Sequence, residues 1–225
     1  MCAAAGVMAY GVRGRSSRLF GPSVWRGIAD RPAIALTFDD GPSESTPELL
    51  ELLGRHGVRA TFFQCGTQVR RLPEVAREVA GAGHEIGNHG HTHARLYLRS
   101  PGAVRDEVFR AQAAISEVTG FRPALFRPPY GARWFGLRTA QKELGLLGVM
   151  WTAIGRDWKL PAQAVAARLS RAAANGAIFC LHDGREAASH PDVSAAIGAV
   201  GRLVPELQDL GYHFESVSEI LCPKN

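Results

Sequence analysis

The sequence has few cysteines and no long hydrophobic run. Its four cysteines, at positions 2, 65, 180 and 222, include no CxxC pair and show no regular spacing. This scatter argues against a disulfide framework and against a thiolate metal site. Cys65 and Cys180 lie within apolar runs and are predicted to be small core residues. No stretch reaches the roughly 18–20 apolar residues that a membrane-spanning helix needs.

A basic stripe across the fold is also lacking. The formal net charge is +5, but residues 1–31 hold five arginines against one acid, Asp30, and the remainder is nearly neutral. A nucleic-acid-binding domain usually carries its basic patch on the fold itself, so we predict no nucleic-acid partner. Residues 1–32 are expected to form a basic N-terminal arm, which could be the remnant of an anchor or signal. Two interpretations stand side by side: a solvated tail, and contact with an anionic membrane or cell wall.

From residue 33 onward, short apolar runs alternate with helical patterns. The predicted strands are 33–38, 60–65, 85–88, 125–127, 147–151, 177–181 and 213–216. The predicted helices are 46–56, 73–82, 101–119, 134–144, 161–174 and 193–210. This alternation predicts an α/β fold in which parallel strands are joined by crossover helices. Seven such units favour a barrel over an open sheet, and no linker divides residues 33–221, which we expect to be one domain.

Two adjacent carboxylates, Asp39 and Asp40, end the first predicted strand within the segment TFDDGP at residues 37–42. In a parallel barrel, strand ends of this kind open onto one face, where active sites are built. Buried charge must be paired or bound to metal, so an acidic pair here indicates a site. The alternative is that Asp39 or Asp40 caps the following helix.

A histidine-rich hexapeptide, NHGHTH at residues 88–93, follows the third predicted strand. His89 and His93 are four residues apart and would face the same way on one helical turn, as in HExxH zinc sites. Two imidazoles and one carboxylate make a three-ligand set that leaves a position for water. Surface histidine clusters look similar, but the acidic pair two units earlier favours a metal site. His91 is interpreted as a spacer, with an alternate ligand as the second interpretation.

Three further strand ends carry polar groups. In RPPYG, residues 127–131, two prolines stiffen the turn, so the amides of Tyr130 and Gly131 can be aimed at a fixed point. Arg127 can hold a carboxylate in a bidentate pair, whereas the alternative interpretation is a plain Pro-Gly surface turn. The other two segments are RDW at 156–158 and LHDG at 181–184. Reactive groups at five strand ends together indicate an active site.

These segments resemble the polysaccharide deacetylase family (the nodulation-protein-B homology domain, carbohydrate esterase family four). TFDDGP, NHGHTH, RPPYG, RDW and LHDG occur in the family's order and spacing over about residues 33–221, and TFDDGP together with RPPYG is highly specific. The resemblance implies a distorted (β/α) barrel with about seven parallel strands, a catalytic domain at 33–221, and metal-dependent N-deacetylation. The usual substrate of the family is N-acetylglucosamine in chitin-like chains or peptidoglycan.

Carried over position by position, the resemblance implies a role for each residue of the first motifs. Asp39 would be the general base, oriented by Arg127. Asp40, His89 and His93 would bind a divalent metal. We expect Zn²⁺ for this donor set, with Co²⁺, Ni²⁺ or Mn²⁺ as alternatives.

The later motifs would supply the oxyanion donor, the acid and the pocket. The backbone amide of Tyr130 would donate to the oxyanion, and His182 would be the general acid, paired with Asp157. Trp158 and Leu181 would receive the acetyl methyl group. The substrate-binding residues implied are Pro129, Tyr130, Trp158 and Leu181.

Two positions depart from the family pattern. Gly90 stands where the family commonly has Ser or Thr, which removes a loop hydrogen bond worth about 1 kcal/mol that His91 or Thr92 could restore. Ile154 stands where the family often carries a second acid, three residues before Asp157. Neither change removes an implied ligand, base or acid.

The predicted function is removal of N-acetyl groups from N-acetylglucosamine-containing glycans by metal-activated water. One alternative is deformylation or deacetylation of a lipid-linked sugar at the membrane, which the basic arm would suit. A non-enzymatic alternative is a degenerate sugar-binding module, which predicts a missing acid, base or ligand. We expect the protein to lie in the bacterial cell envelope or to be secreted, with the cytoplasm as the alternative. The sequence makes no prediction about the oligomeric state.

Overall fold

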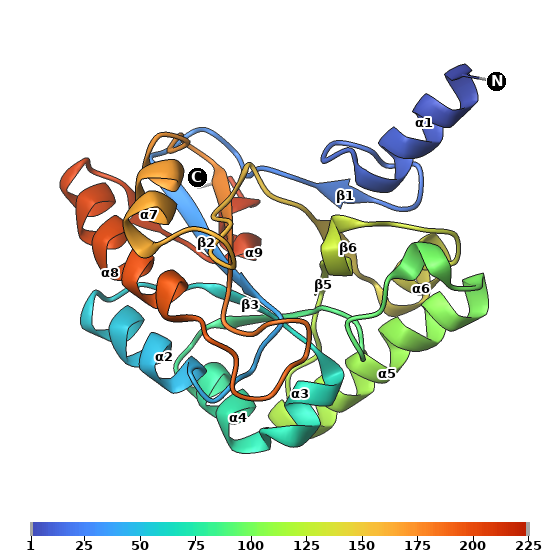
Figure 1. The fold of residues 1–225 in the computed structure, drawn as a ribbon, viewed down its shortest axis with the longest axis horizontal. Helices are drawn as coiled ribbons and strands as arrows, with labels where there is room; N and C mark the ends of the chain where they lie inside the picture. The colour runs from blue at the N-terminus through green and yellow to red at the C-terminus, as the bar shows by residue number, and fades with distance from the viewer. Residues whose placement is uncertain (1, 224–225) are drawn as a thin grey trace.

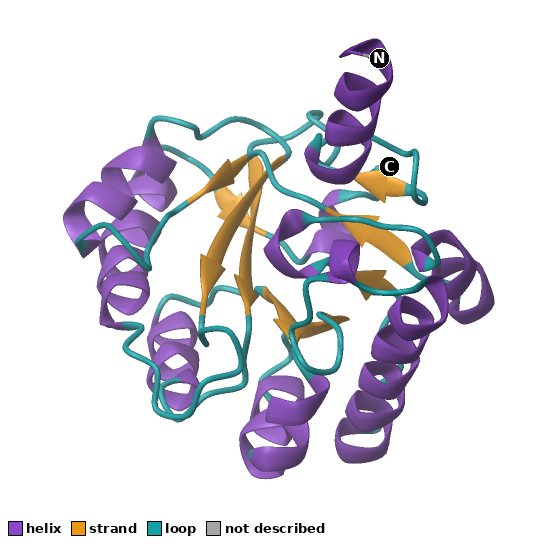
Figure 2. Cartoon of the chain, turned by 45° about the vertical axis from the view of Figure 1, so that its right-hand side comes forward, coloured by secondary structure: helices purple, strands orange, loops and turns teal. Residues whose placement is uncertain are grey.

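The computed structural model describes residues 2–223, in which nine strands form one sheet with parallel pairing throughout (Figures 1 and 2). The strand order is β1-β6-β5-β4-β3-β2-β8-β7, and β9 pairs with β2. The strands are β1 (Ser23–Val24), β2 (Ala33–Asp39), β3 (Thr61–Gln64), β4 (Glu85–Asn88), β5 (Leu125–Phe126), β6 (Leu147–Val149), β7 (Ala153–Ile154), β8 (Ala177–His182) and β9 (His213–Phe214).

Most of the helices lie around the outer face of this sheet (Figure 1). They are α1 (Cys2–Arg13), α2 (Thr46–Arg55), α3 (Gly66–Arg71), α4 (Pro73–Gly81), α5 (Pro101–Thr119), α6 (Leu137–Leu144), α7 (Ala162–Ser170), α8 (Ser194–Asp209) and α9 (Val217–Ile220), with 3₁₀ turns at Leu96–Leu98 and Pro129–Gly131. The predicted distorted (β/α) barrel is confirmed, although two more strands are present than the seven predicted. Within residues 2–223 no pairing joins β1 to β7, so the barrel is incomplete.

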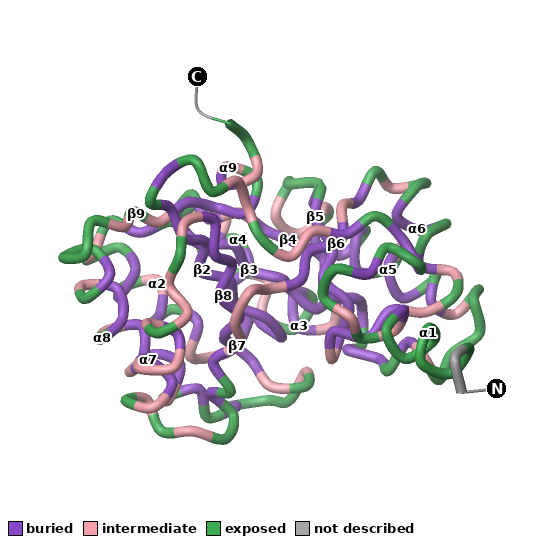
Figure 3. Tube along the Cα trace, turned by 90° about the horizontal axis from the view of Figure 1, so that it is seen from above, coloured by how far each residue is buried: buried purple, intermediate pink, exposed green. Residues whose placement is uncertain are grey.

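Local sequence explains the longest elements. All seven residues of β2 are buried, as expected for a parallel strand covered on both faces. Helix α5 begins where the Ser100 hydroxyl accepts a hydrogen bond from the Ala103 amide, with Pro101 at the first helical position, and ends at Gly120 with φ 75°. The purple core in Figure 3 follows the strands and the helix faces turned toward them.

The predicted N-terminal arm is only partly a tail. Helix α1 stands away from the body, and its residues 4–10 are all exposed (Figures 1 and 3). The segment after it docks: Phe20 is buried and β1 pairs with β6. Buried Arg133 holds this segment, because its guanidinium donates to the carbonyls of Gly14 and Ser17 and its amide to that of Val12. Across the described part of the chain, every helix is too short or too polar to cross a bilayer.

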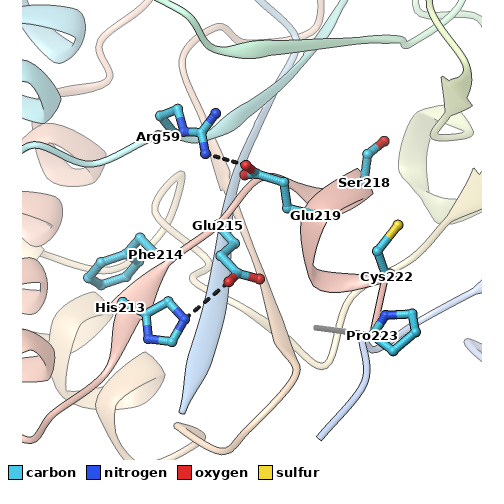
Figure 4. A pocket seen from close by; sticks show the side chains of 8 residues that line it. All are labelled: Arg59, His213, Phe214, Glu215, Ser218, Glu219, Cys222 and Pro223. Atoms are coloured by element: carbon cyan, nitrogen blue, oxygen red, sulfur yellow. Dashed lines mark hydrogen bonds and ion pairs between the residues drawn. The ribbon is translucent and has the colours of Figure 1, made fainter. Parts of the chain in front are cut away.

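A cavity of about 550 Å³ lies at the amino ends of β2 and β3 (Figure 4). Its two glutamates are paired, Glu215 with Arg31 at 2.7 Å and Glu219 with Arg59. Polar groups at the amino end of such a sheet serve stability, whereas catalytic groups gather at the carboxyl end. The cavity is lined by Arg59, His213, Phe214, Glu215, Ser218, Glu219, Cys222 and Pro223.

Candidate metal centre and catalytic site

The carboxyl ends of β2 and β4 bring Asp40, His89 and His93 together. The Asp40 Oδ1 atom lies 3.2 Å from His89 Nε2 and 3.0 Å from His93 Nε2, and all three side chains are buried. His89 Nδ1 lies 2.8 Å from the Arg127 carbonyl, which can only accept, so Nδ1 carries the proton and Nε2 keeps its lone pair. One carboxylate and two imidazoles, with ligand atoms within 4.8 Å of one another, fit a divalent cation.

The metal-site loop is not the helical turn that the four-residue spacing predicted. Residues 89–93 lie outside any helix, and the chain turns through positive φ at Gly90 (80°) and His93 (57°). His89 and His93 converge through this loop. Asp40 also has positive φ, at 76°. Non-glycine residues rarely adopt this conformation, and residues held in it cluster at functional sites.

Glu107 on α5 holds this loop, and the sequence motifs did not reveal it. Its carboxylate accepts from the amides of His91 (3.0 Å) and Thr92 (2.8 Å) and from the Thr92 hydroxyl (2.8 Å). The Asn88 side chain accepts from the Gly90 amide at 2.9 Å. These bonds fix the loop without a hydroxyl at position 90. The signal available in the sequence was an acid on the apolar face of α5, beside Val108 and Ala111.

His91 faces away from the three ligands. Its ring lies against Gly66, and burial lowers its pKa. It does not share the ligand group of Asp40, His89 and His93. This placement agrees with the spacer interpretation.

The charge state of Asp40 suits a ligand. Burial raises the pKa of Asp40, but the effect of the neighbouring His89 and His93 side chains outweighs it. The net effect holds the pKa of Asp40 well below its usual range. Its second oxygen accepts a hydrogen bond from the Glu186 amide at 2.9 Å, which orients the carboxylate.

Asp39 is paired with Arg127 in the barrel interior. Arg127 Nη1 donates to Asp39 Oδ1 at 2.7 Å and to the Thr37 hydroxyl oxygen at 2.6 Å. Its other nitrogens donate to the carbonyls of Val149 and Met150, each at 3.2 Å. The pair is therefore joined by one bond, not the bidentate pair that the sequence suggested. Neither aspartate caps the following helix, which was the alternative interpretation. Asp39 bonds to Arg127, Asp40 faces the histidines, and no side chain caps the start of α2.

His182 and Asp157 form the second buried pair. His182 Nδ1 lies 3.0 Å from Asp157 Oδ1, and the His182 amide donates to Asp157 Oδ2 at 3.1 Å. Burial lowers the pKa of His182, but the hydrogen bond and charge of Asp157 outweigh it and raise the pKa to about 9. The Trp158 ring lies edge-on to His182 at 5.1 Å, and Trp158 is about half exposed. His182 is therefore protonated at neutral pH, with Nε2 as its free atom.

Tyr130 closes the site from the Pro129–Gly131 turn. Its φ is 58°, its ring centroid lies 4.5 Å from that of His93, and its backbone amide has no acceptor among residues 2–223. Burial raises the pKa of the Tyr130 hydroxyl. Pro129 is buried beside Gly90. The backbone amide is therefore available as a donor, and its role toward an oxyanion stays a prediction.

Leu181 is not brought into this group. Side chains alternate along β8, and Leu181 is buried in the apolar cluster that contains Leu36 and Val165. Its neighbour Cys180 points into the site instead, where its Sγ atom donates to Asp39 Oδ2 at 3.4 Å. The run AIFCLH is apolar almost throughout, so its sequence does not reveal which residues face the interior.

The geometry agrees with two independent comparisons. The sequence profile of the family described as polysaccharide deacetylase matches residues 26–149. A chitooligosaccharide deacetylase of Bradyrhizobium is 36% identical over 202 residues, which cover 86% of this chain and 92% of that protein. The chain belongs to the polysaccharide deacetylase family. The resemblance inferred from the motifs is thus confirmed.

Other members of the polysaccharide deacetylase family are similar over most of this chain. The peptidoglycan-N-acetylglucosamine deacetylase PgdA of Listeria monocytogenes is 35% identical over 193 residues. These residues cover 85% of this chain but only 39% of PgdA, so the chain spans well under half of that relative.

Two solved structures share the fold. The Bc1960 peptidoglycan N-acetylglucosamine deacetylase superimposes with a TM-score of 0.82 at 26% identity, covering 88% of this chain and 92% of that one. BA3943 from Bacillus anthracis, described as a carbohydrate esterase family four pseudoenzyme, superimposes with a TM-score of 0.81 at 26% identity, covering 89% and 69%. The fold therefore occurs both with and without activity. Whether this chain is catalytic depends on the side chains of its site.

Proposed function

We propose that the chain is a metal-dependent hydrolase that removes acetyl groups from N-acetylglucosamine residues of peptidoglycan or chitin-like chains. The observation that carries this is the position of the ligand set beside a paired carboxylate, with His89 Nε2 at 4.0 Å from Asp39 Oδ2 and 3.2 Å from Asp40 Oδ1. The names of the relatives, which act on peptidoglycan and chitooligosaccharides, support the substrate class.

Each side chain has a step in the proposed reaction. A divalent cation at Asp40, His89 and His93 would polarise the acetyl carbonyl and lower the pKa of a water molecule. Asp39, held by Arg127, accepts the proton of the attacking water as the new C–O bond forms. The Tyr130 amide donates to the oxyanion, a contribution worth about 3 kcal/mol.

Protonated His182 completes the reaction. Its Nε2 proton passes to the amide nitrogen as the C–N bond breaks, because an amine anion does not leave unaided. Asp157 accepts from Nδ1 and keeps the ring oriented. The products are acetate and a free amino sugar. The donor set of one carboxylate and two imidazoles supports zinc as the cation, and Co²⁺, Ni²⁺ and Mn²⁺ fit the same set.

A non-catalytic, sugar-binding role is less well supported. Such a protein would lack an acid, a base or a ligand, whereas Asp39, Asp40, His89, His93 and His182 are all in place. A lipid-linked sugar as substrate has the basic arm in its favour, but the relatives quoted above act by name on glycan chains.

Acetate release from chitooligosaccharides, peptidoglycan and a lipid-linked N-acetyl sugar tests these proposals together. We expect release from the first two, its loss with a chelator, and recovery when zinc is added back. Activity that resists complete metal removal would overturn metal dependence. Exclusive release from the lipid-linked sugar would replace the proposed substrate, and no release from any of the three would favour the binding role.

We further propose that the arm rests on an anionic bilayer and places the enzyme in the cell envelope. Large apolar side chains are exposed on and beside α1, namely Val7, Met8, Tyr10, Leu19 and Phe135. The first 29 residues contain no acid but carry four arginines. Arg13 contacts the ring of Tyr97, and Arg15 contacts the ring of Trp25. These rings carry no net charge, so they do not neutralise the two guanidinium groups. Apolar side chains flanked by arginines suit an anionic lipid surface.

Co-sedimentation with vesicles tests this contact. We expect binding to phosphatidylglycerol vesicles, weaker binding to phosphatidylcholine, and release by salt. Leu19→Ser should weaken binding, whereas Leu210→Ser, which removes an even more exposed leucine far along the chain, should not. Equal binding to both lipids, or equal effects of the two variants, would contradict the proposal.

A further inference from the structure

A second group of potential metal ligands lies beside the first. Asp39, Cys180 and His182 come from the adjacent strands β2 and β8, in which Asp39 is paired with His182 and Thr37 with Cys180. Cys180 and His182 are two residues apart and therefore face the same side of the sheet. One ligand atom from each of the three residues lies within 4.8 Å of the other two.

Each residue of this group has one candidate ligand atom that no residue outside the group occupies. Arg127 occupies Oδ1 of Asp39 and leaves Oδ2 to the Cys180 thiol at 3.4 Å. Asp157 occupies Nδ1 of His182 and leaves its Nε2. Asp39 and Cys180 are buried, and His182 is only partly exposed. A carboxylate oxygen, a sulfur and an imidazole nitrogen converge here, each held by a partner outside the group or by the strand itself.

We propose that Asp39, Cys180 and His182 form a second, inhibitory site for a thiophilic divalent cation such as Zn²⁺ or Cd²⁺. A thiolate with an imidazole selects such cations over Mg²⁺ and Ca²⁺, which prefer oxygen ligands. On binding, the S–H bond of Cys180 and the Nε2–H bond of protonated His182 break, and both protons go to solvent. A sulfur–metal bond and a nitrogen–metal bond form with no change of oxidation state. The scattered cysteine spacing gave no sign of this site, because its ligands meet only through strand pairing.

The inhibitory effect follows from which side chains the second cation occupies. The assignment of inhibition, unlike that of binding, rests on the proposed function. A cation here binds Asp39 and replaces the Nε2 proton of His182, so both the proposed base and the proposed acid are lost. The Arg127 charge, 2.7 Å from Asp39, and a cation on Asp40 both oppose its entry. The site therefore fills after the first one and only when metal is in excess.

Cadmium binding tests the site without any activity. In a background carrying Cys2→Ser and Cys222→Ser, metal-free protein is titrated with Cd²⁺ and the ultraviolet charge-transfer absorption of cadmium thiolate is followed. We expect two bound equivalents, with the absorption appearing on the second. Adding Cys180→Ser should abolish the absorption and leave one equivalent, whereas adding Cys65→Ser, which removes the other buried thiol, should preserve both.

Activity supplies an independent arm. Excess Zn²⁺ should inhibit, excess Mg²⁺ should not, and Cys180→Ser should raise the inhibitory Zn²⁺ concentration at least tenfold. Outer partners of a metal ligand alone change affinity by about 10–100-fold, so loss of a ligand should exceed the lower figure. Absorption that survives Cys180→Ser, or an unchanged inhibitory concentration, overturns the proposal. If Cys180→Ser does not fold, Cys180→Ala takes its place. A protein without activity that shows the Cys180-dependent absorption retains the site and loses only the proposed function.

Discussion

Asp39 Oδ1 lies 2.7 Å from Arg127 Nη1, and both side chains are buried in the barrel interior. Arg127 is in turn stacked on the Phe63 ring at 4.1 Å and bonded to two carbonyls, so it cannot follow a displaced partner. This rigid cation fixes one carboxylate oxygen and leaves the other facing the site. Asp39 is therefore placed to exchange a proton without moving.

Asp39→Asn should lower turnover by about 10²–10⁴-fold, the usual contribution of a positioned acid or base. The amide keeps the shape of the carboxylate but cannot accept the proton. Because Asp39 is not in the Asp40 ligand group, bound metal should be retained. Acetate release measured beside metal content checks both statements, and a fully active variant would refute the assignment of the base.

His89→Ala should remove both metal and activity, whereas His91→Ala should keep both. The His89 Nε2 atom faces Asp40 Oδ1, while the His91 ring lies against Gly66. The two variants delete the same side chain from one loop, so they are matched in chemistry. Metal content after dialysis is the measurement, and metal loss in His91→Ala alone would reverse the ligand and spacer assignments.

Asp157→Asn should move the alkaline limb of the pH–rate profile to lower pH. The folded-state pKa of His182, about 9, is raised above its ordinary value of 6.5 mainly by Asp157. The active, protonated form is therefore lost as pH rises through about 9, and without Asp157 it is lost earlier. The same pair contributes stability that is complete below pH 6.5 and disappears as pH rises through about 9. An unchanged limb in Asp157→Asn would show that another group sets it, and Asp209→Asn, an exposed aspartate on α8, is the control.

Glu107→Gln should weaken metal binding by about 10–100-fold, as the loss of outer partners of a metal site commonly does. The amide replaces one of the oxygens that accept from His91 and Thr92. Glu117→Gln on the same helix removes an exposed carboxylate paired with Arg70 and should leave metal binding unchanged. Competition with a metal indicator measures both, and equal affinities would show that the loop holds its shape without Glu107.

The sequence anticipated the parts of the site that depend on strand ends. Asp39, His89, Arg127 and His182 follow apolar runs, and parallel strands bring such ends to one face. It could not place Glu107, whose contact with the loop depends on how the following helix α5 packs against it.

Other features escaped because local pattern carries no signal for them. Strands β1 and β7 are two residues long, too short for any periodicity. The buried run of β8 lacks polar alternation, so Leu181 rather than Cys180 was expected in the pocket. The helical turn predicted for His89 and His93 failed because positive φ at Gly90 bends the chain out of a helix.

The docked half of the arm bears on where this chain can be shortened. A chain beginning at Ala33 would lose β1, and β6 would then present its unpaired backbone at the edge of the sheet. It would also remove the Gly14 and Ser17 carbonyls that accept hydrogen bonds from Arg133. The buried guanidinium would then lack these acceptors and could not replace them with water. Removal of residues 1–10 alone spares these contacts, so the practical limit of the folded unit falls within the arginine-rich segment that follows them.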